Sequence, residues 1–235
     1  KNVSEFRAGH AVFGTCEGAF AGYARAHERN LALKPANLTL EQAAAVPTSA
    51  FAALQALRNR GEIRSGQKVL IVGATGGVGT FAVQIAKSFG AEVTAVCSTT
   101  KMDWVRSLGA DHVIDYTQED FTKSDRRYDL ILDTGGNRSL SDLRRVLSPS
   151  GTLVLIGGEG GNRVLGATDK WIQALLLSPF VRQNLRPLST MPNKKDLLFV
   201  KDLIEAGKLT PVIDRTFALS EVQDAFRYLE KGHGR

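Results

Sequence analysis

The sequence predicts an α/β protein built on a doubly wound parallel sheet, and three observations carry this prediction. A short run of apolar, mostly β-branched residues at 69–72 is typical of a buried parallel strand. A glycine-rich turn at residues 73–79 follows it directly. Apolar residues then recur at helical spacing as far as Gly90, and a second apolar run at 93–97 completes a strand, turn, helix, strand unit.

Composition narrows the class of protein. The chain has 235 residues, of which 43% are hydrophobic and 23% are charged, as in folded globular proteins. Its two cysteines, Cys16 and Cys97, form neither a disulfide framework nor a metal-binding spacing, so we expect a reducing, cytoplasmic location. Residues 1–15 lack the pattern of a signal peptide, and the apolar runs are too short to cross a bilayer, so no membrane association is predicted.

The net charge of +6 is spread over short clusters such as residues 125–127. These clusters have no interleaved aromatic residues, so they indicate solvated surface rather than a nucleic-acid-binding face.

The first 66 residues are expected to precede the parallel sheet. Residues 11–14 and 19–24 are predicted to form two antiparallel strands. Thr39 with Gln42 forms a capping box for a short helix at 41–45. A second helix is predicted at 49–58, after an interruption at Pro47, and a linker at 61–66 leads to the first parallel strand.

After residue 97 the alternation of strands and helices continues, which predicts a sheet with both faces covered. Ser220 with Gln223 is interpreted as a capping box for the last helix. The helix at 170–177 is strongly apolar, and either a subunit contact or a core position accounts for it. The predicted strands lie at 112–114, 129–132, 152–156, 186–188 and 211–213, and the predicted helices at 105–108, 139–147, 170–177, 196–206 and 220–231.

The glycine turn indicates a nucleotide site. Gly73, Gly76 and Gly79 lie three residues apart, one residue longer than the G-x-G-x-x-G spacing. The physical requirements are still met, because the turn is tight and a helix N-terminus follows that can face a pyrophosphate. The alternative is a glycine-rich turn without a ligand.

The end of the second strand favours NADPH over NADH. An NAD site usually places Asp or Glu there to bind the ribose hydroxyls. This chain has Ser98, two threonines and Lys101 instead. Hydroxyls and an ammonium group suit a 2′-phosphate. Alternatively, these hydroxyl residues cap the next helix, and a residue can cap the helix and bind the phosphate at the same time.

Several stretches together resemble the medium-chain dehydrogenase/reductase superfamily, and within it the zinc-independent quinone oxidoreductase branch. They are VLIVGATGGVGTFAVQIAKSFGAEV at 69–93, LGADHVIDY at 108–116, LKPANLTLEQAAAVP at 33–47, GTLVLIGG at 151–158 and LIEAGKLTPVIDRTFALSEVQDAF at 203–226. The resemblance implies a Rossmann domain at 46–207, preceded at 1–45 by the C-terminal part of a GroES-like β catalytic domain and followed at 208–235 by a return segment. It also implies that the chain is truncated at its N-terminus.

The resemblance assigns cofactor-binding roles by position. The pyrophosphate turn corresponds to Thr75, Gly76, Gly77, Val78 and Gly79, after Gly73. The 2′-phosphate contacts correspond to Ser98 and Lys101, flanked by the aromatic Tyr116. The adenosine and nicotinamide borders correspond to Thr134, Gly135, Ile156 and Gly157, for which strand-end turns without a ligand are the alternative.

The implied activity is NADPH-dependent hydride transfer to a quinone, an enone or another activated carbonyl, without zinc. Only residues 14–18 separate the first two predicted strands, with Cys16 alone, where zinc-containing relatives insert a four-cysteine lobe. No catalytic residue is assigned. Tyr23 is interpreted as a core aromatic rather than a proton donor, and Phe180 as packed on a helix or facing the nicotinamide.

Other functions stay open at this point. The chain could be a catalytically silent NADP(H)-binding protein, such as a redox sensor or a nucleic-acid-associated relative. It could be a fragment that only binds the cofactor, or a zinc-dependent alcohol dehydrogenase with its ligands in the upstream part. A homodimer is one option by analogy with the family.

Overall fold

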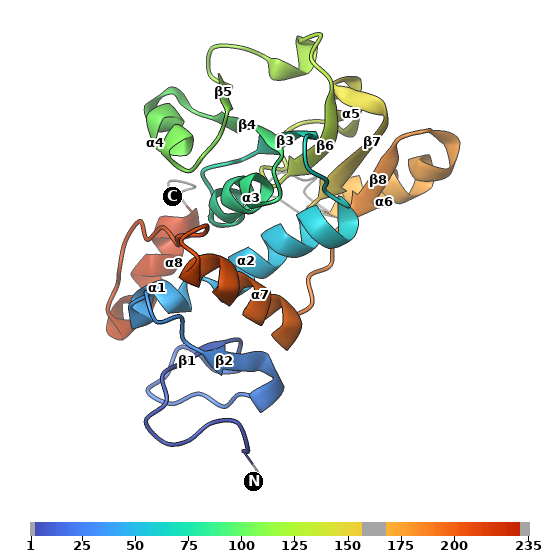
Figure 1. Ribbon diagram of the computed structural model, residues 1–235. Coiled ribbons are helices and arrows are strands. Elements are labelled where there is room, and N and C mark those ends of the chain that lie inside the picture. The colour runs from blue at the N-terminus through green and yellow to red at the C-terminus, as the bar shows by residue number, and fades with distance from the viewer. Residues whose placement is uncertain (1–2, 157–167, 231–235) are drawn as a thin grey trace. The chain divides into compact units, whose positions relative to one another are not determined.

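The computed structural model describes residues 3–156 and 168–230. The chain divides into two compact units, residues 1–51 with 191–235, and residues 52–190 (Figure 1).

The second unit contains a six-stranded sheet in which every neighbouring pair is parallel. The strand order is β5-β4-β3-β6-β7-β8. The chain therefore starts at the centre, moves outward on one side, and then returns to build the other side, which is the doubly wound order that the sequence predicted. The strands are β3 (Lys68–Val72), β4 (Glu92–Cys97), β5 (His112–Asp115), β6 (Tyr128–Asp133), β7 (Leu147–Leu155) and β8 (Asn184–Pro187).

Helices cover both faces of this sheet. Helices α3 (Gly77–Ser88) and α4 (Met102–Ser107) pack against β3, β4 and β5. Leu70 and Val72 of β3 belong to a buried cluster that includes Leu143 of α5 (Leu140–Arg145) and Ala174 of α6 (Thr168–Leu177). Val69 and Ile71, which alternate with them along β3, are also fully buried. The apolar run at 69–72 led us to expect this burial on both faces.

One helical stretch crosses the division between the units. It consists of α2 (Pro47–Leu54) and a π-helical continuation at Gln55–Arg60. The expected interruption separates α1 (Leu40–Ala44) from α2, but α2 begins at Pro47 itself rather than at the predicted residue 49. Proline suits the first position of a helix, because its missing N–H has no intrahelical partner to lose.

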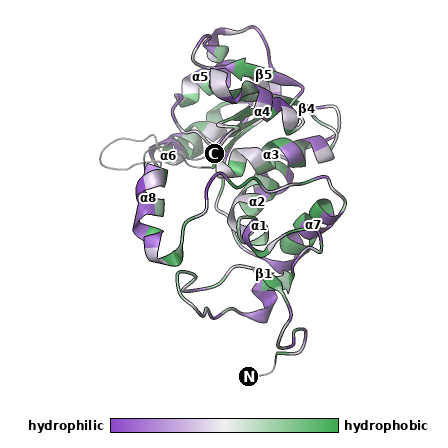
Figure 2. Ribbon diagram, turned by 90° about the vertical axis from the view of Figure 1, so that its left-hand side faces the viewer, coloured by the Kyte–Doolittle hydropathy of each residue, from purple (hydrophilic) through white to green (hydrophobic). Residues whose placement is uncertain are grey.

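In the first unit, β1 (Val12–Gly14) pairs antiparallel with β2 (Leu31–Leu33). Helix α1 (Leu40–Ala44) begins with the predicted capping box, in which the Gln42 N–H donates to Thr39 Oγ1 at 3.2 Å and the Thr39 N–H donates to Gln42 Oε1 at 2.9 Å. Helix α8 (Val222–Glu230) has no buried residue and appears mainly in purple and white in Figure 2.

Helix α7 (Lys194–Glu205) belongs to the first unit, whereas the sequence-based boundaries at 45 and 207 placed it in the nucleotide-binding domain. Hydrogen bonds across the sequence explain the difference. Asn37 Nδ2 donates to the Ile204 carbonyl at 2.8 Å, and the Ala36 N–H donates to Glu205 Oε1 at 3.1 Å. These bonds attach α7 to the chain that follows β2.

Three local predictions are wrong. Residues 19–24 form bends rather than a strand, and the real partner of β1 is β2. Residues 211–213 form no strand. At the start of the last helix, Glu221 Oε2 accepts the Ala218 N–H at 2.9 Å, so the cap lies earlier than the predicted box of Ser220 with Gln223. Within residues 3–156 and 168–230, no helix has the length and apolar character needed to span a bilayer.

Candidate dinucleotide-binding site

The turn between β3 and α3 depends on glycine at two of its three predicted positions. Gly73 has a φ of +80°, which side-chain-bearing residues rarely adopt, and a Cβ there would lie 2.5 Å from Thr134 Oγ1. At Gly79 a Cβ would lie 2.1 Å from the Gly73 carbonyl oxygen. The first glycine therefore permits the turn, and the last permits α3 to approach β3 closely.

Gly76 differs from these two glycines because the space around it is open. Its nearest neighbour to an added Cβ would be the Gly73 carbonyl oxygen at 3.6 Å. It is the residue before α3, and its backbone is extended, with φ of −74° and ψ of 169°. The absence of crowding lets another group approach the backbone at this position, as a pyrophosphate must.

The N-terminus of α3 offers hydrogen-bond donors. Within the described part of the chain, no side chain caps this helix. Its first N–H groups have no intrahelical partner, and those of Gly77 and Val78 are among them. A helix of 12 residues also carries a partial positive charge at this end. The residues present therefore fit a phosphate group, with Thr75 and Gly76 in the approach to the helix.

The predicted 2′-phosphate residues lie at the ends of two neighbouring strands. Ser98 follows β4 and precedes a 3₁₀ turn at Thr99–Lys101. The Tyr116 N–H donates to the Cys97 carbonyl at 3.1 Å, which places Tyr116 beside the end of β4 with 49% of its surface exposed. The Lys101 ammonium has no hydrogen bond or ion pair with any residue that the structure describes. It is available for an anionic ligand.

Sequence reasoning missed a carboxylate next to these residues. Asp115 ends β5, pairs in register with Cys97 and is 7% exposed. Its Oδ1 accepts the Thr117 N–H at 2.9 Å and the Thr117 hydroxyl at 2.7 Å, while its Oδ2 accepts the Thr99 hydroxyl. The hydrogen bond from Thr99 is the largest of the effects that lower the pKa of Asp115. Its oxygens are engaged by the chain itself, so it holds the 98–101 turn and is not aimed at a ribose. Its position directly after the predicted strand at 112–114 was the available signal.

The end of β6 meets the glycine turn. The Thr134 hydroxyl lies 2.8 Å from the Val72 carbonyl oxygen and 3.1 Å from that of Gly73. A Cβ on Gly135 would lie 3.7 Å from the Val72 side chain. The Ile156 N–H donates to the Asp133 carbonyl at 3.1 Å, which brings the end of β7 to the same edge. Gly157 lies outside the described residues.

A second functional group that the sequence did not reveal is the carboxylate of Asp133, the last residue of β6. It is 2% exposed, and burial raises its pKa, with partial compensation from the Gly136 N–H and from Lys170. Lys170 is 37 positions away in the chain, so no local pattern connects the two.

A family model described as "Zinc-binding dehydrogenase" matches residues 108–235, more than half of the chain. The chain belongs to this family, within the medium-chain dehydrogenase/reductase superfamily.

Curated relatives of this family member include NAD(P)H oxidoreductase RTN4IP1, mitochondrial, of Mus musculus. It is 36% identical over 257 residues, with 100% of this chain and 65% of the relative covered. The chloroplast envelope quinone oxidoreductase homolog of Arabidopsis thaliana is 32% identical, with 98% and 72% covered. The chloroplastic NADPH-dependent alkenal/one oxidoreductase of the same plant is 34% identical, with 92% and 51% covered. The chain thus spans about two thirds of the length of the RTN4IP1 proteins that it matches.

Solved structures of similar proteins share the fold of this dehydrogenase-family chain. The quinone oxidoreductase of Coxiella burnetii has a TM-score of 0.84 at 29% identity, with 100% of this chain and 72% of that chain covered. An alcohol dehydrogenase superfamily protein of Novosphingobium aromaticivorans has a TM-score of 0.82 at 30% identity, with 97% and 72% covered. The predicted combination of a Rossmann sheet with part of a GroES-like domain is confirmed.

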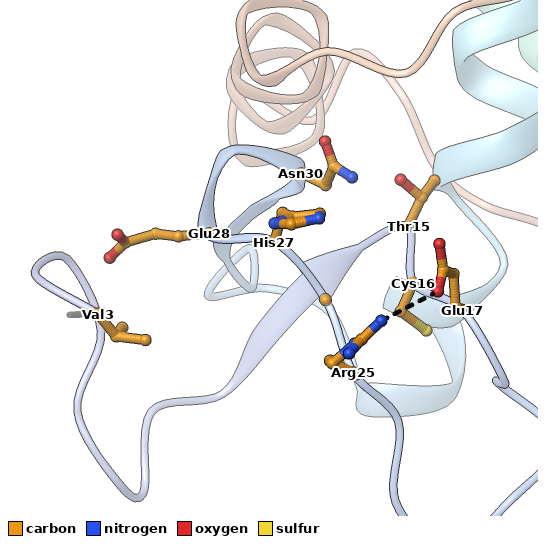
Figure 3. A pocket seen from close by; sticks show the side chains of 9 residues that line it. Val3, Thr15, Cys16, Glu17, Arg25, His27, Glu28 and Asn30 are labelled. Atoms are coloured by element: carbon orange, nitrogen blue, oxygen red, sulfur yellow. Dashed lines mark ion pairs between the residues drawn. The ribbon is translucent and has the colours of Figure 1, made fainter. Parts of the chain in front are cut away.

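The first unit of this dehydrogenase-family chain contains a separate pocket of about 620 Å³ (Figure 3). Most of its charged side chains form ion pairs or hydrogen bonds within the unit. Arg25 forms a 3.7 Å ion pair with Glu17, and Glu28 accepts hydrogen bonds from the backbone of residues 4 and 5. Nothing here corresponds to a glycine turn at a helix N-terminus. The lining residues are Val3, Thr15, Cys16, Glu17, Arg25, Ala26, His27, Glu28 and Asn30.

Two aromatic residues are exposed. Tyr23 is 97% exposed, so the prediction of a core aromatic is wrong. Phe180 is 84% exposed, so helix packing does not account for it, and its other role, facing the nicotinamide, stays a prediction. Among the residues that the structure describes, neither has a partner that would make it a catalytic group, and no catalytic residue is assigned. Within residues 3–156 and 168–230, no group of three His, Cys, Asp or Glu side chains comes together as a metal site.

Proposed function

We propose that this protein is an NADPH-dependent oxidoreductase that transfers a hydride to a quinone, an enone or another activated carbonyl. The observation that carries the proposal is that a helix N-terminus and two strand-end turns lie at one edge of the sheet. The uncapped N-terminus of α3, the Ser98–Lys101 turn and the Thr134 turn follow β3, β4 and β6, which are adjacent strands. This edge lies at the point where the strand order reverses, which is where doubly wound sheets bind dinucleotides.

Each part of the edge has a distinct task in this proposal. The N–H groups at the start of α3 bind the pyrophosphate, and Gly76 leaves room for it. Ser98 and Lys101 bind the 2′-phosphate, with Tyr116 beside them. Thr134, Gly135 and Ile156 border the nicotinamide half. When bound, the cofactor supplies the hydride, and the protein contributes binding, orientation and exclusion of water.

The preference for NADPH is supported by charge. Lys101 is a cation without a partner in the described chain, and the neighbouring Asp115 is occupied by Thr99 and Thr117. The name of the NADPH-dependent alkenal/one oxidoreductase supports this preference, whereas the NAD(P)H relatives support only a nicotinamide cofactor. The names of the alkenal/one oxidoreductase and the quinone oxidoreductase homolog support the substrate classes.

The reaction is proposed to need no zinc, because the sequence has neither the four-cysteine lobe nor paired ligands near residues 47–48. Metal analysis of the purified active protein tests this, and stoichiometric zinc required for turnover would contradict it. A cytoplasmic location and a homodimer remain proposals, to be checked by cell fractionation and by sedimentation.

The decisive experiment has two stages. The purified chain is titrated with NADPH and NADH, and we expect tighter binding of NADPH. NADPH oxidation is then followed in the full-length protein with a para-benzoquinone and with an α,β-unsaturated ketone. Tight binding without turnover of either class would overturn the reductase proposal and favour a silent NADP(H)-binding protein.

A further inference from the structure

A buried ion pair joins the end of β6 to the start of α6. Lys170 Nζ lies 3.7 Å from Asp133 Oδ2, and the two side chains are 18% and 2% exposed. Asp133 is the last residue of a central strand, and Lys170 is the third residue of α6. The pair therefore connects two segments that the sequence does not bring together.

The same two residues close a ring around the turn that follows β6. The Gly136 N–H donates to Asp133 Oδ1 at 3.0 Å, and the Lys170 ammonium donates to the Gly136 carbonyl. Both polar groups of the Gly136 backbone are thus fixed by the pair. The ring encloses Thr134 and Gly135, so it fixes the conformation of both.

This turn lies directly on the glycine turn. The Thr134 hydroxyl lies within hydrogen-bond distance of the carbonyl oxygens of both Val72 and Gly73, with Val72 the nearer. The approach is so close that a Cβ on Gly73 would lie 3.0 Å from the Gly135 nitrogen. A shift of the ring would therefore be transmitted to the first residue of the candidate cofactor site.

The strand order shows which half of a dinucleotide meets the ring. The candidate 2′-phosphate residues follow β4 and β5, on one side of β3. The ring follows β6, on the other side of β3. A dinucleotide whose pyrophosphate lies at α3 and whose adenosine half extends toward β4 must place its nicotinamide half toward β6 and β7.

Stability alone does not explain the pair. A cation in the first turn of a helix is disfavoured by the helix dipole. A buried ion pair also contributes little net stability compared with apolar residues of similar size, because both charges lose their hydration. We propose that Asp133 and Lys170 are positioning residues, which hold the Thr134–Gly136 turn in the conformation that receives the nicotinamide half. This inference rests on the proposed cofactor.

The test compares NADPH with 2′,5′-ADP, which contains the adenosine half and the 2′-phosphate but no nicotinamide. Affinities for both are measured by calorimetry for the wild type, Lys170→Met, Asp133→Asn and Lys170→Arg. We expect Lys170→Met and Asp133→Asn to bind NADPH about tenfold more weakly while the affinity for 2′,5′-ADP changes less than about twofold. Lys170→Arg keeps the charge and should restore most of the NADPH affinity.

Lys87→Met is the matched control. Lys87 forms a 2.8 Å ion pair with Asp111, which precedes β5 and so lies at the opposite edge of the sheet. It should leave both affinities unchanged. Near-ultraviolet circular dichroism establishes that each variant is folded, and Asp133→Asn keeps the test open if Lys170→Met does not fold.

The outcomes separate the two proposals. Equal weakening of NADPH and 2′,5′-ADP in the folded variants would overturn the positioning role, as would unchanged NADPH affinity. A wild-type chain that binds neither ligand would instead overturn the proposed cofactor.

Discussion

Replacing Gly79 with alanine should destabilise the second unit, because α3 lies too close to the end of β3 to leave room for a methyl group. The added Cβ would lie 2.1 Å from the Gly73 carbonyl oxygen and 2.7 Å from both Cα and the carbonyl carbon of Ala74. All three are backbone atoms, so no side chain can rotate away. Helix α3 would have to move by about 1 Å in a densely packed region.

Overpacking of this kind costs about 1–3 kcal/mol, and we expect the upper end because backbone has to move. For a chain of this size the melting temperature would fall by about 2–4 °C for each kcal/mol. The two tryptophans, Trp104 and Trp171, both lie in the second unit. Their fluorescence during urea unfolding therefore measures the free energy of unfolding of the unit that carries the substitution.

Gly76→Ala is the control within the same turn. Its Cβ would meet only the Gly73 carbonyl oxygen at 3.6 Å, and its φ of −74° suits alanine. We expect a loss of stability below about 1 kcal/mol but NADPH binding weakened about tenfold, because the methyl group occupies the approach to α3. The reasoning is refuted if Gly79→Ala unfolds at the wild-type urea concentration, or if Gly76→Ala is equally destabilised.

Three further predictions concern other parts of the chain. Lys101→Ala should weaken NADPH binding about tenfold and NADH binding less than about twofold, measured by titration, and equal losses would contradict the 2′-phosphate assignment. Burial raises the pKa of Asp133, so its contribution to stability falls as pH rises through that pKa. Lys170→Met removes the compensating cation. Its free energy of unfolding should therefore be about 3 kcal/mol below that of the wild type at about pH 8, and the difference should be smaller at about pH 5. A difference that does not depend on pH would refute this. Thr39→Ala removes the capping box with Gln42 and should cost about 1 kcal/mol locally, seen as faster amide exchange in residues 40–44.

Sequence patterns correctly predicted the elements whose structure depends on interactions within a few residues. The run at 69–72, the glycines of the turn and the Thr39 capping box each act within a few residues, and all three are present as expected. Strand predictions were less accurate where the pairing partner lies far away in the sequence. Residues 19–24 have strand-like composition, yet the hydrogen bonds of β1 are satisfied by residues 31–33. Composition cannot specify which distant segment supplies the partner.

The predicted site residues came from spacing along the chain, and the structure brings most of them to one edge. Gly73, Ser98, Tyr116, Thr134 and Ile156 each follow a parallel strand, so strand order alone places them together. Gly157 lies outside the described residues.

The sequence by itself thus determined the strand, glycine turn, helix and strand at 68–97 and the basic, carboxylate-free end of β4, because each consists of consecutive residues. Only the tertiary structure decided which side-chain contacts fix the turns at the carboxyl edge of the sheet. Asp115 is joined to Thr99 across 16 positions, and Asp133 is joined to Lys170 across 37. Burial makes such contacts energetically important, and burial is a property of the packed chain rather than of any single stretch of it.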